Sequence, residues 1–202
     1  MAVTYGQHDL GASWVVDELI HRASHALVDE GRVWIIDPVD AGDALEQARA
    51  LGEPVAVLQL LNRHNRDSAA VAQRLGVPRL KVPAVLPDTP FSVLNLDWGP
   101  GWKEVALWWP DRRALVVPES LGTAPLFAVG PGPVGVHPVR RIAPPHSLRP
   151  FVPEHLLVGH GPPVHGQDAA GGVIDALDRG RSDIPRVFLK AGSMVRGIFS
   201  RH

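Results

Sequence analysis

Blocks of apolar and polar positions alternate along the chain and predict strands and helices in turn. One apolar block at 55–61 contains a single polar residue, which is typical of a strand buried on both faces. A polar loop at 62–67 follows, and apolar residues then recur at helical spacing as far as Leu75. Asp67 and Ser68 are both good N-cap residues for that helix. In α/β folds, a polar loop between a strand and a helix lies at the carboxyl edge of the sheet and often carries the chemistry. The same pattern also fits an ordinary surface loop, so the rest of the chain decides between the two.

The residues around this segment predict an α/β domain. Residues 32–37 form a further strand, closed by Pro38, and residues 43–51 carry helical spacing that stops at Gly52. Together with residues 55–75 they make a strand–helix–strand–helix unit, which is typical of α/β folds. The remaining pattern predicts edge strands at 13–20 and 24–28 and further strands at 79–82, 92–96, 104–109, 114–117 and 154–158. It also predicts irregular chain at 122–150, with one helical turn at 145–148, and a helix at 167–179.

A basic and apolar segment, residues 186–201, lies at the end of the sequence. Its pattern predicts a final strand or helix. Four apolar side chains favour packing on the core over a role at a membrane surface: Val187, Leu189, Val195 and Ile198.

Composition narrows the class of protein without identifying a function. The chain has 202 residues, 45% of them hydrophobic and 20% charged, which predicts one globular domain over residues 1–202. A net charge of −1 and a pI near 6.8 give no reason to expect a nucleic-acid partner. Cysteine is absent, which excludes disulfides and thiolate metal ligands. The sequence shows neither a signal peptide nor an apolar run long enough to span a bilayer, so we expect a soluble, cytoplasmic protein, and an oligomer is compatible with these data.

Four framework segments follow one another in the order seen in a known family. Residues 24–28 (SHALV) and 33–38 (VWIIDP) resemble an opening hairpin that ends in an Asp. Residues 114–121 (ALVVPESL) resemble a segment with a "GD.L" pattern, and residues 156–163 (LLVGHGPP) resemble a late strand that ends in Gly-His. These phrases are similar to the metallo-β-lactamase superfamily over residues 13–180. The resemblance implies an α/β (α+β) fold in which two sheets lie between two layers of helices, an αββα four-layer sandwich.

The resemblance also implies that the first metal site of the family is lost. The family signature Thr-His-x-His-x-Asp-His falls on residues 62–68, so the two His ligands of this site fall on Arg63 and Asn65. The third ligand falls on Trp98. An arginine cannot replace a metal-binding imidazole, because its guanidinium stays protonated. We therefore expect this site to hold no metal.

The second metal site of the family is partly kept. Its Asp falls on Asp67, its metal-bridging Asp on Glu119 and its late His on His160, whereas its remaining His falls on Ser68. Two carboxylates and one imidazole could hold one divalent ion.

Two arginines in the same loop, Arg63 and Arg66, oppose this metal. A cation about 4 Å from another positive charge is disfavoured by several kcal/mol at the dielectric of a protein surface. The guanidinium fork also pairs well with carboxylates. We therefore expect ion pairs from Arg63 or Arg66 to Asp67 or Glu119 in place of a metal.

The other polar and aromatic candidates receive less specific predictions. His64 lies one position away from the ligand register, so we expect its side chain to turn away from the cleft. Asp37 should support the loop through hydrogen bonds. Trp98 and Trp102 could line a cleft, where aromatic walls suit an apolar or planar ligand.

Six further histidines show no paired metal-binding spacing. His21 and His25 should be exposed on an edge strand, and four others should lie in loops or turns: His137, His146, His155 and His165.

Two function hypotheses from different classes follow. In the first, the chain is a pseudoenzyme without a metal cofactor, which binds an unknown small molecule or protein at a cleft formed by Arg63, Asn65, Arg66, Asp67, Ser68, Trp98, Glu119 and His160. In the second, it is a metal-dependent hydrolase of an ester, thioester or lactone, with one Zn, Fe or Mn ion on Asp67, Glu119 and His160. Fold alone does not choose between them, and the lost ligands favour the first.

Overall fold

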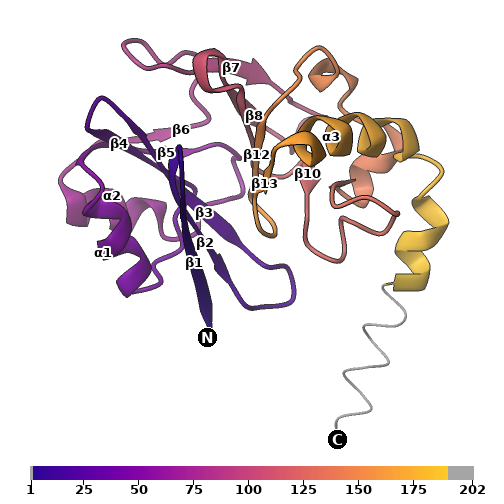
Figure 1. Ribbon diagram of the computed structural model, residues 1–202, viewed down its shortest axis with the longest axis horizontal. Coiled ribbons are helices and arrows are strands. Elements are labelled where there is room, and N and C mark those ends of the chain that lie inside the picture. Colours follow the sequence, from indigo (N-terminus) through magenta and orange to yellow (C-terminus); the bar gives the residue numbers. More distant parts are fainter. Residues whose placement is uncertain (1, 191–202) are drawn as a thin grey trace, which may run out of the picture.

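Two β-sheets lie beside each other, and helices cover the outer face of each (Figure 1). The computed structural model describes residues 2–190. The first sheet has the strand order β1-β2-β3-β4-β5-β6. Its strands are β1 Val3–His8, β2 Gly11–Val16, β3 Ala23–Asp29, β4 Arg32–Ile36, β5 Glu53–Gln59 and β6 Arg79–Lys81, and its helices are α1 Asp43–Arg49 and α2 Ser68–Leu75.

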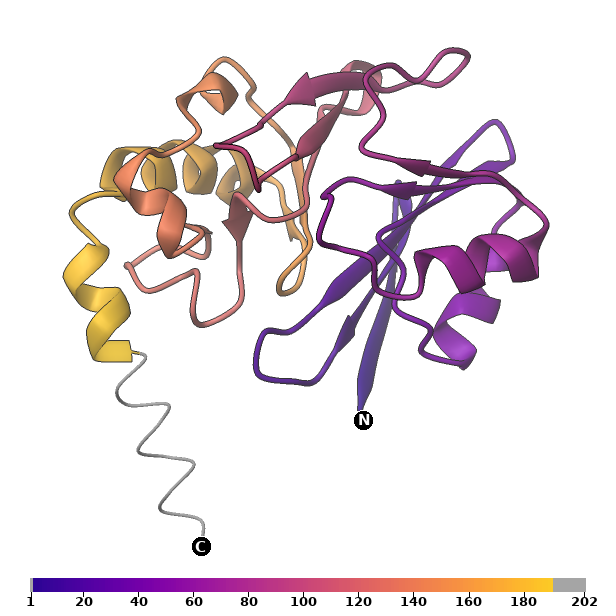
Figure 2. The same ribbon diagram turned by 180° about the vertical axis from the view of Figure 1, so that it is seen from behind.

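The second sheet has the strand order β13-β12-β9-β8-β7, and helix α3 packs on it (Figure 2). Its strands are β7 Ser92–Asn95, β8 Val105–Trp109, β9 Ala114–Val117, β12 His155–Val158 and β13 Val164–His165, and α3 spans Gln167–Arg179. The short elements around it are the pair β10 Leu121–Gly122 and β11 Gly135–Val136 and the 3-10 turns Pro110–Arg112, Val139–Ile142 and His146–Leu148.

Three apolar layers hold the four layers of backbone together. Between the two sheets, side chains such as Leu58, Leu107 and Trp109 are buried against one another. The outer layers lie under the helices: Leu45 and Val71 pack on the first sheet, and the apolar face of α3 packs on the second. This arrangement confirms the predicted αββα four-layer sandwich.

The direction of four strands brings their carboxyl ends to one region. In the first sheet β4 runs parallel to β5, and in the second β9 runs parallel to β12. Isolated bridges at this end, Leu61 with Glu104 and Arg22 with His160, join segments that follow strands of one sheet to segments of the other. The loops after these strands therefore meet in one place, which is where α/β folds carry binding sites.

The N-terminal prediction needs two corrections. Strand β1 was not predicted, because most of its side chains are exposed and it shows no apolar alternation. It pairs with β2, so the predicted edge strands β2 and β3 lie inside the sheet. The prediction that His25 is exposed was also wrong, because its ring is directed at the second sheet, where Nε2 donates to the Val158 carbonyl, and only 1% of its surface is accessible. Strand β2 also ends at Val16 rather than at residue 20.

The later predictions are mostly confirmed, with additions. The region 122–150 is irregular and contains the predicted helical turn as His146–Leu148, but also strand β11 and a second 3-10 turn. The predicted C-terminal element at 186–201 is described only as far as residue 190, where residues 184–190 are helical. Leu189 exposes 73% of its surface, so the prediction that it packs on the core was wrong. Within residues 2–190, no helix is long and apolar enough to cross a membrane.

Candidate metal centre

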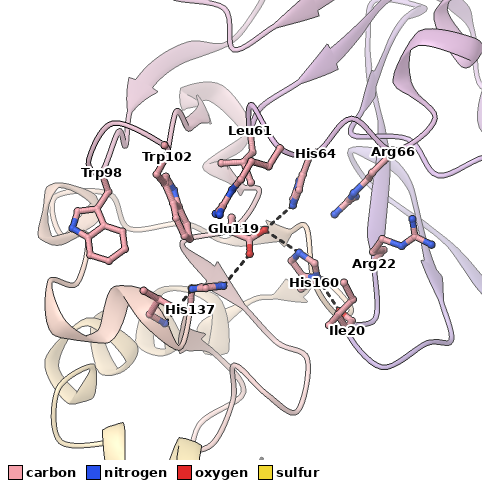
Figure 3. A pocket seen from close by; sticks show the side chains of 13 residues that line it. Ile20, Arg22, Leu61, His64, Arg66, Trp98, Trp102, Glu119, His137 and His160 are labelled. Atoms are coloured by element: carbon pink, nitrogen blue, oxygen red, sulfur yellow. Dashed lines mark hydrogen bonds and ion pairs between the residues drawn. The ribbon is translucent and has the colours of Figure 1, made fainter.

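Three loops place titratable side chains in one pocket (Figure 3). His64 follows β5, Glu119 comes two residues after β9, and His160 comes two residues after β12. Since β9 and β12 are parallel neighbours, Glu119 and His160 leave the same edge of the second sheet. His64 comes from the first sheet, so the pocket lies where the two sheets meet.

Glu119 is the centre of this group. Its Oε2 atom lies 2.6 Å from His64 Nε2 and 3.1 Å from His160 Nε2. Its other oxygen, Oε1, lies 3.1 Å from His137 Nε2. One donor atom each from His64, Glu119 and His160 fall within 4.8 Å of one another, so these three residues could hold a metal ion. The metal-ligating set predicted from the sequence contained Asp67 instead of His64.

The second ring nitrogen of His64 faces another carboxylate. Its Nδ1 lies 3.1 Å from Asp37 Oδ2, and Asp37 Oδ1 accepts the backbone N–H of Leu60 at 3.1 Å. The predicted supporting role of Asp37 is therefore confirmed. Since a carboxylate oxygen only accepts, His64 Nδ1 carries a proton, and its Nε2 points at Glu119.

The remaining two imidazoles differ in their second hydrogen bond. His160 Nδ1 lies 2.8 Å from the carbonyl oxygen of Ile20, so this nitrogen is a donor and leaves Nε2 directed at Glu119. His137 Nδ1 accepts the backbone N–H of Val139 at 3.2 Å, so its proton is on Nε2. His137 therefore donates to Glu119 and is not oriented as a metal ligand.

Burial and neighbouring charges act in opposite directions on the pKa of His64. Burial and the positive charge of Arg66 lower it. The carboxylates of Asp37 and Glu119 raise it more strongly, and the net effect is a raised pKa. In the absence of a metal, the two carboxylates thus favour the protonated form of His64.

Glu119 shows the opposite net effect. Burial would raise the pKa of its carboxyl group, but hydrogen bonds from the three imidazoles, His137 first, lower this pKa well below its usual range. The group is therefore ionised, which is the state that a metal ligand needs.

A second buried carboxylate, that of Glu104, holds the backbone of Glu119 in place. Glu104 is fully buried and accepts the backbone N–H groups of Glu119 and Ser120 at 3.2 and 2.8 Å. Its other oxygen accepts the Ser120 hydroxyl and, at 2.5 Å, the indole N–H of Trp102. Burial raises the pKa of Glu104, and the hydrogen bonds from Ser120 and Trp102 oppose this rise. Glu104 thus fixes both the backbone of the central carboxylate and one aromatic wall of the pocket.

The pocket has a volume of about 720 Å³ and mixes apolar, aromatic and cationic walls. Its lining residues are Ile20, Arg22, Leu61, Arg63, His64, Arg66, Trp98, Gly101, Trp102, Glu119, His137, Val139 and His160. Five of the eight residues predicted for the cleft are among them: Arg63, Arg66, Trp98, Glu119 and His160. Trp102 lines the pocket as well.

The other three predicted cleft residues point elsewhere. Asn65 Oδ1 lies 3.4 Å from Lys81 Nζ, and Asp67 Oδ2 accepts the backbone N–H of Asp40 at 2.8 Å. Ser68 is buried in the first turn of α2.

The predicted ion pairs of the two arginines are absent from the described residues. Arg63 is exposed, and its guanidinium lies 4.4 Å from the centre of the Trp102 ring. Arg66 donates instead to three backbone carbonyl oxygens, those of Ala23, Asp37 and Gly159. Burial lowers the pKa of Arg66, and the charges of Asp37 and Glu119 oppose this.

The prediction that His64 turns away from the cleft was wrong. Leu61 to His64 form a turn closed by the His64 N–H to the Leu61 carbonyl, and Arg66 has a positive φ of 37°. This irregular backbone directs His64 inward, and a comparison of sequence positions alone does not reveal it. The available signal was the loop itself, which is polar and follows a buried strand.

Comparison with known proteins identifies the fold. The chain aligns with DIM-1 metallo-β-lactamase with a TM-score of 0.59 and 14% sequence identity, covering 89% of this chain and 95% of that one. It aligns with a metallo-β-lactamase from Hirschia baltica with a TM-score of 0.62 and 10% identity, covering 88% and 98%. For a metallo-β-lactamase from Erythrobacter litoralis, the TM-score is 0.57, the identity 11% and the coverage 88% and 92%. No family model and no curated protein matches the sequence. The chain therefore has the metallo-β-lactamase fold.

Proposed function

We propose that this protein binds one divalent metal ion with His64, Glu119 and His160 and acts as a metal-dependent hydrolase. The observation that carries the proposal is the hydrogen bonding of the two imidazoles. Each donates its Nδ1 proton to a fixed acceptor, Asp37 or the Ile20 carbonyl, and directs Nε2 at Glu119. Metal-binding histidines in proteins are held in this way, with the outer nitrogen donating to a carboxylate or a carbonyl.

The donor set fits a divalent ion in chemistry and in charge. Two imidazoles and one carboxylate form a common three-residue set of catalytic zinc sites, in which a fourth position stays open. Without a metal, both nitrogens of His64 and of His160 face hydrogen-bond acceptors. A divalent ion would take the place of the Nε2 contacts and add positive charge beside the ionised Glu119. Tetrahedral zinc ligands lie about 3.3 Å apart, so the 2.6 Å contact between His64 and Glu119 would have to lengthen by about 0.7 Å.

When bound, such an ion polarises a carbonyl group and lowers the pKa of a water molecule. The chain supplies the rest of the site. His137 holds Glu119 Oε1 through its Nε2 proton, so only Oε2 faces the two ligand imidazoles. Trp98 and Trp102 form an aromatic wall of the pocket. The structures that share the fold are described as metallo-β-lactamases, which supports a hydrolytic reaction on an ester, thioester, lactone or related acyl compound.

The metal-free binding protein remains the second candidate, because one observation favours it. Three arginines line the pocket beside a single carboxylate, Glu119, and fixed positive charge opposes a cation. In that protein, His64 and His160 would keep their direct hydrogen bonds to Glu119.

Metal binding separates the two candidates. Protein treated with a chelator and dialysed should take up close to one equivalent of Zn²⁺ per chain, and Zn²⁺ should raise its melting temperature. The variants His64→Gln and His160→Gln should each lose this uptake, whereas His137→Gln should weaken it roughly 10- to 100-fold, because His137 only orients a ligand. Ester hydrolysis by the zinc-loaded protein is the second readout.

Two controls make the result specific. Asp67→Asn should keep full uptake, because Asp67 binds the backbone of Asp40 and not the pocket. His146→Gln, at an exposed histidine in a 3-10 turn, should also keep it. Wild-type protein that takes up no zinc, or that loses uptake only in Asp67→Asn, would refute the proposed site.

A further inference from the structure

The three arginines that line the pocket differ in their hydrogen bonds and ion pairs. Arg22 forms an ion pair with Glu18, in which its Nε and Nη2 atoms donate to the two carboxylate oxygens. Arg66 donates to three backbone carbonyl groups. Arg63 differs from both, because it makes no hydrogen bond or ion pair with any residue in the described range 2–190.

Arg63 is nevertheless held in a defined position. Its guanidinium lies over the Trp102 ring at 4.4 Å from the ring centre. The ring itself is fixed, because Trp102 is buried and its indole N–H donates to the buried carboxylate of Glu104 at 2.5 Å. A guanidinium that rests on an aromatic face keeps the N–H groups at its edge available, and these donate in a planar fork.

The surroundings of Arg63 combine this free charge with apolar surface. Trp98 lies 5.6 Å from Trp102, ring centre to ring centre, and lines the pocket. Ile20 and Val139 line it too and expose 38% and 55% of their surfaces. A ligand that pairs with Arg63 could therefore place an apolar body in the pocket, near His64 and Glu119.

We propose that the pocket recognises organic carboxylates, and that Arg63 on the Trp102 ring binds the carboxylate group. Matched geometry favours this ligand, since the guanidinium fork pairs with two carboxylate oxygens at once. One unpaired guanidinium balances one charge, so a monocarboxylate fits better than a phosphate monoester, which carries close to two. Resting on the proposed function, the substrate of the hydrolase is then an acyl compound that carries a separate carboxylate.

The test compares two probes that differ only in charge, 4-phenylbutanoate and the neutral 4-phenylbutanamide. Binding is measured by calorimetry and by tryptophan fluorescence, both on chelator-treated and on zinc-loaded protein. Wild-type protein should bind the acid at least about 10-fold more tightly than the amide, a preference typical of a charge-assisted pair. Arg63→Gln should reduce this preference to near unity, and Arg63→Lys should keep part of it, because lysine keeps the charge but not the fork.

The matched control is Arg113→Gln, which removes an exposed arginine that pairs with Glu154 outside the pocket. This variant should keep the full preference for the acid. The preference should also persist in chelator-treated protein, so its presence there is independent of the proposed metal site.

Four outcomes would overturn the inference. Equal binding of acid and amide by the wild type, or an acid preference that survives Arg63→Gln, would show that Arg63 does not read the charge. An acid preference found only in zinc-loaded protein would place the carboxylate on the metal instead. Displacement of the probe by inorganic phosphate at lower concentration than by acetate would assign the position to a phosphate group.

Discussion

Histidines gather at both ends of β12, and the two groups differ in what surrounds them. The group at the carboxyl end surrounds one carboxylate: His64, His137 and His160 around Glu119. In the group at the amino end, the Nδ1 atoms of His155 and His165 lie 2.8 Å apart, and the ring of His8 lies 5.2 Å from that of His165. Among the described residues, no carboxylate is hydrogen-bonded to these three rings.

The pKa values follow this difference. Burial and the neighbouring imidazoles of His165 and His155 lower the pKa of His8 to about 4. Carboxylates raise the pKa of His64, although that ring is buried more deeply. Neighbouring imidazoles thus oppose a positive charge on His8, whereas the carboxylates around His64 favour positive charge there, either a proton or a metal ion.

The largest expected effect comes from removing that central carboxylate. Glu119→Gln leaves the imidazoles of the site without a counter-charge, and breaking a buried pair by removing one partner costs roughly 3–5 kcal/mol. Urea unfolding of chelator-treated protein at pH 7 should show a loss of this order. Glu154→Gln, which removes an exposed partner of Arg113, should cost only about 0–1 kcal/mol. Equal, small losses in both variants would contradict the comparison.

A buried histidine without a carboxylate partner predicts a pH effect. His25 accepts the Ser13 hydroxyl at Nδ1 and donates from Nε2 to the Val158 carbonyl. The pKa of His25 is lowered to about 3, mainly by burial; the hydrogen bond to the Val158 carbonyl opposes this decrease, and the smaller effects of His8 and Arg66 add to it while Asp37 opposes it. As the pH decreases, His25 is therefore protonated near pH 6.5 in the unfolded chain but only near pH 3 in the folded chain.

The free energy of unfolding should consequently fall by about 1.4 kcal/mol per pH unit as the pH decreases from about 6 towards 3 through this group alone. Its contribution is fully present above pH 6.5. His25→Gln should flatten the curve of stability against pH in this interval, measured by urea unfolding at closely spaced pH values. An unchanged slope in the variant would show that His25 is protonated in the folded state.

The smallest effects distinguish the two arginines of the loop. Arg63→Ala removes an exposed group on an aromatic ring and should change stability by at most about 1 kcal/mol. Arg66→Ala removes one hydrogen bond from each of three carbonyl groups, of which those of Asp37 and Gly159 keep a second donor, and should cost roughly 1–3 kcal/mol. A large loss of stability in Arg63→Ala would instead support the ion pair to Asp67 or Glu119 that was predicted from the sequence.

The fold was largely predictable from the sequence, because its strongest signals are local. The apolar block that became β5, the polar loop after it and the helical spacing of α2 all depend on neighbouring residues. Strand β1 escaped prediction because it is an edge strand whose side chains are mostly exposed, so it carries no alternating pattern.

The site was predictable only in part, because it depends on backbone geometry. Glu119 and His160 were found from the phrases at the ends of β9 and β12, which are parallel neighbours. His64 was missed because the turn at Leu61 and the positive φ at Arg66 rotate the loop. His137 was missed because its segment, residues 122–150, has no periodicity, and only the folded chain brings it to Glu119.

The central claim is that His64, Glu119 and His160 share one divalent ion, and a crystal grown with Zn²⁺ and measured on both sides of the zinc absorption edge tests it most directly. The account predicts one anomalous peak at about 2.0–2.2 Å from His64 Nε2, His160 Nε2 and Glu119 Oε2, with His137 still donating to Glu119 Oε1. A pocket without an anomalous peak, in which Glu119 keeps its direct contacts to both imidazoles, would contradict the account and favour the metal-free binding protein.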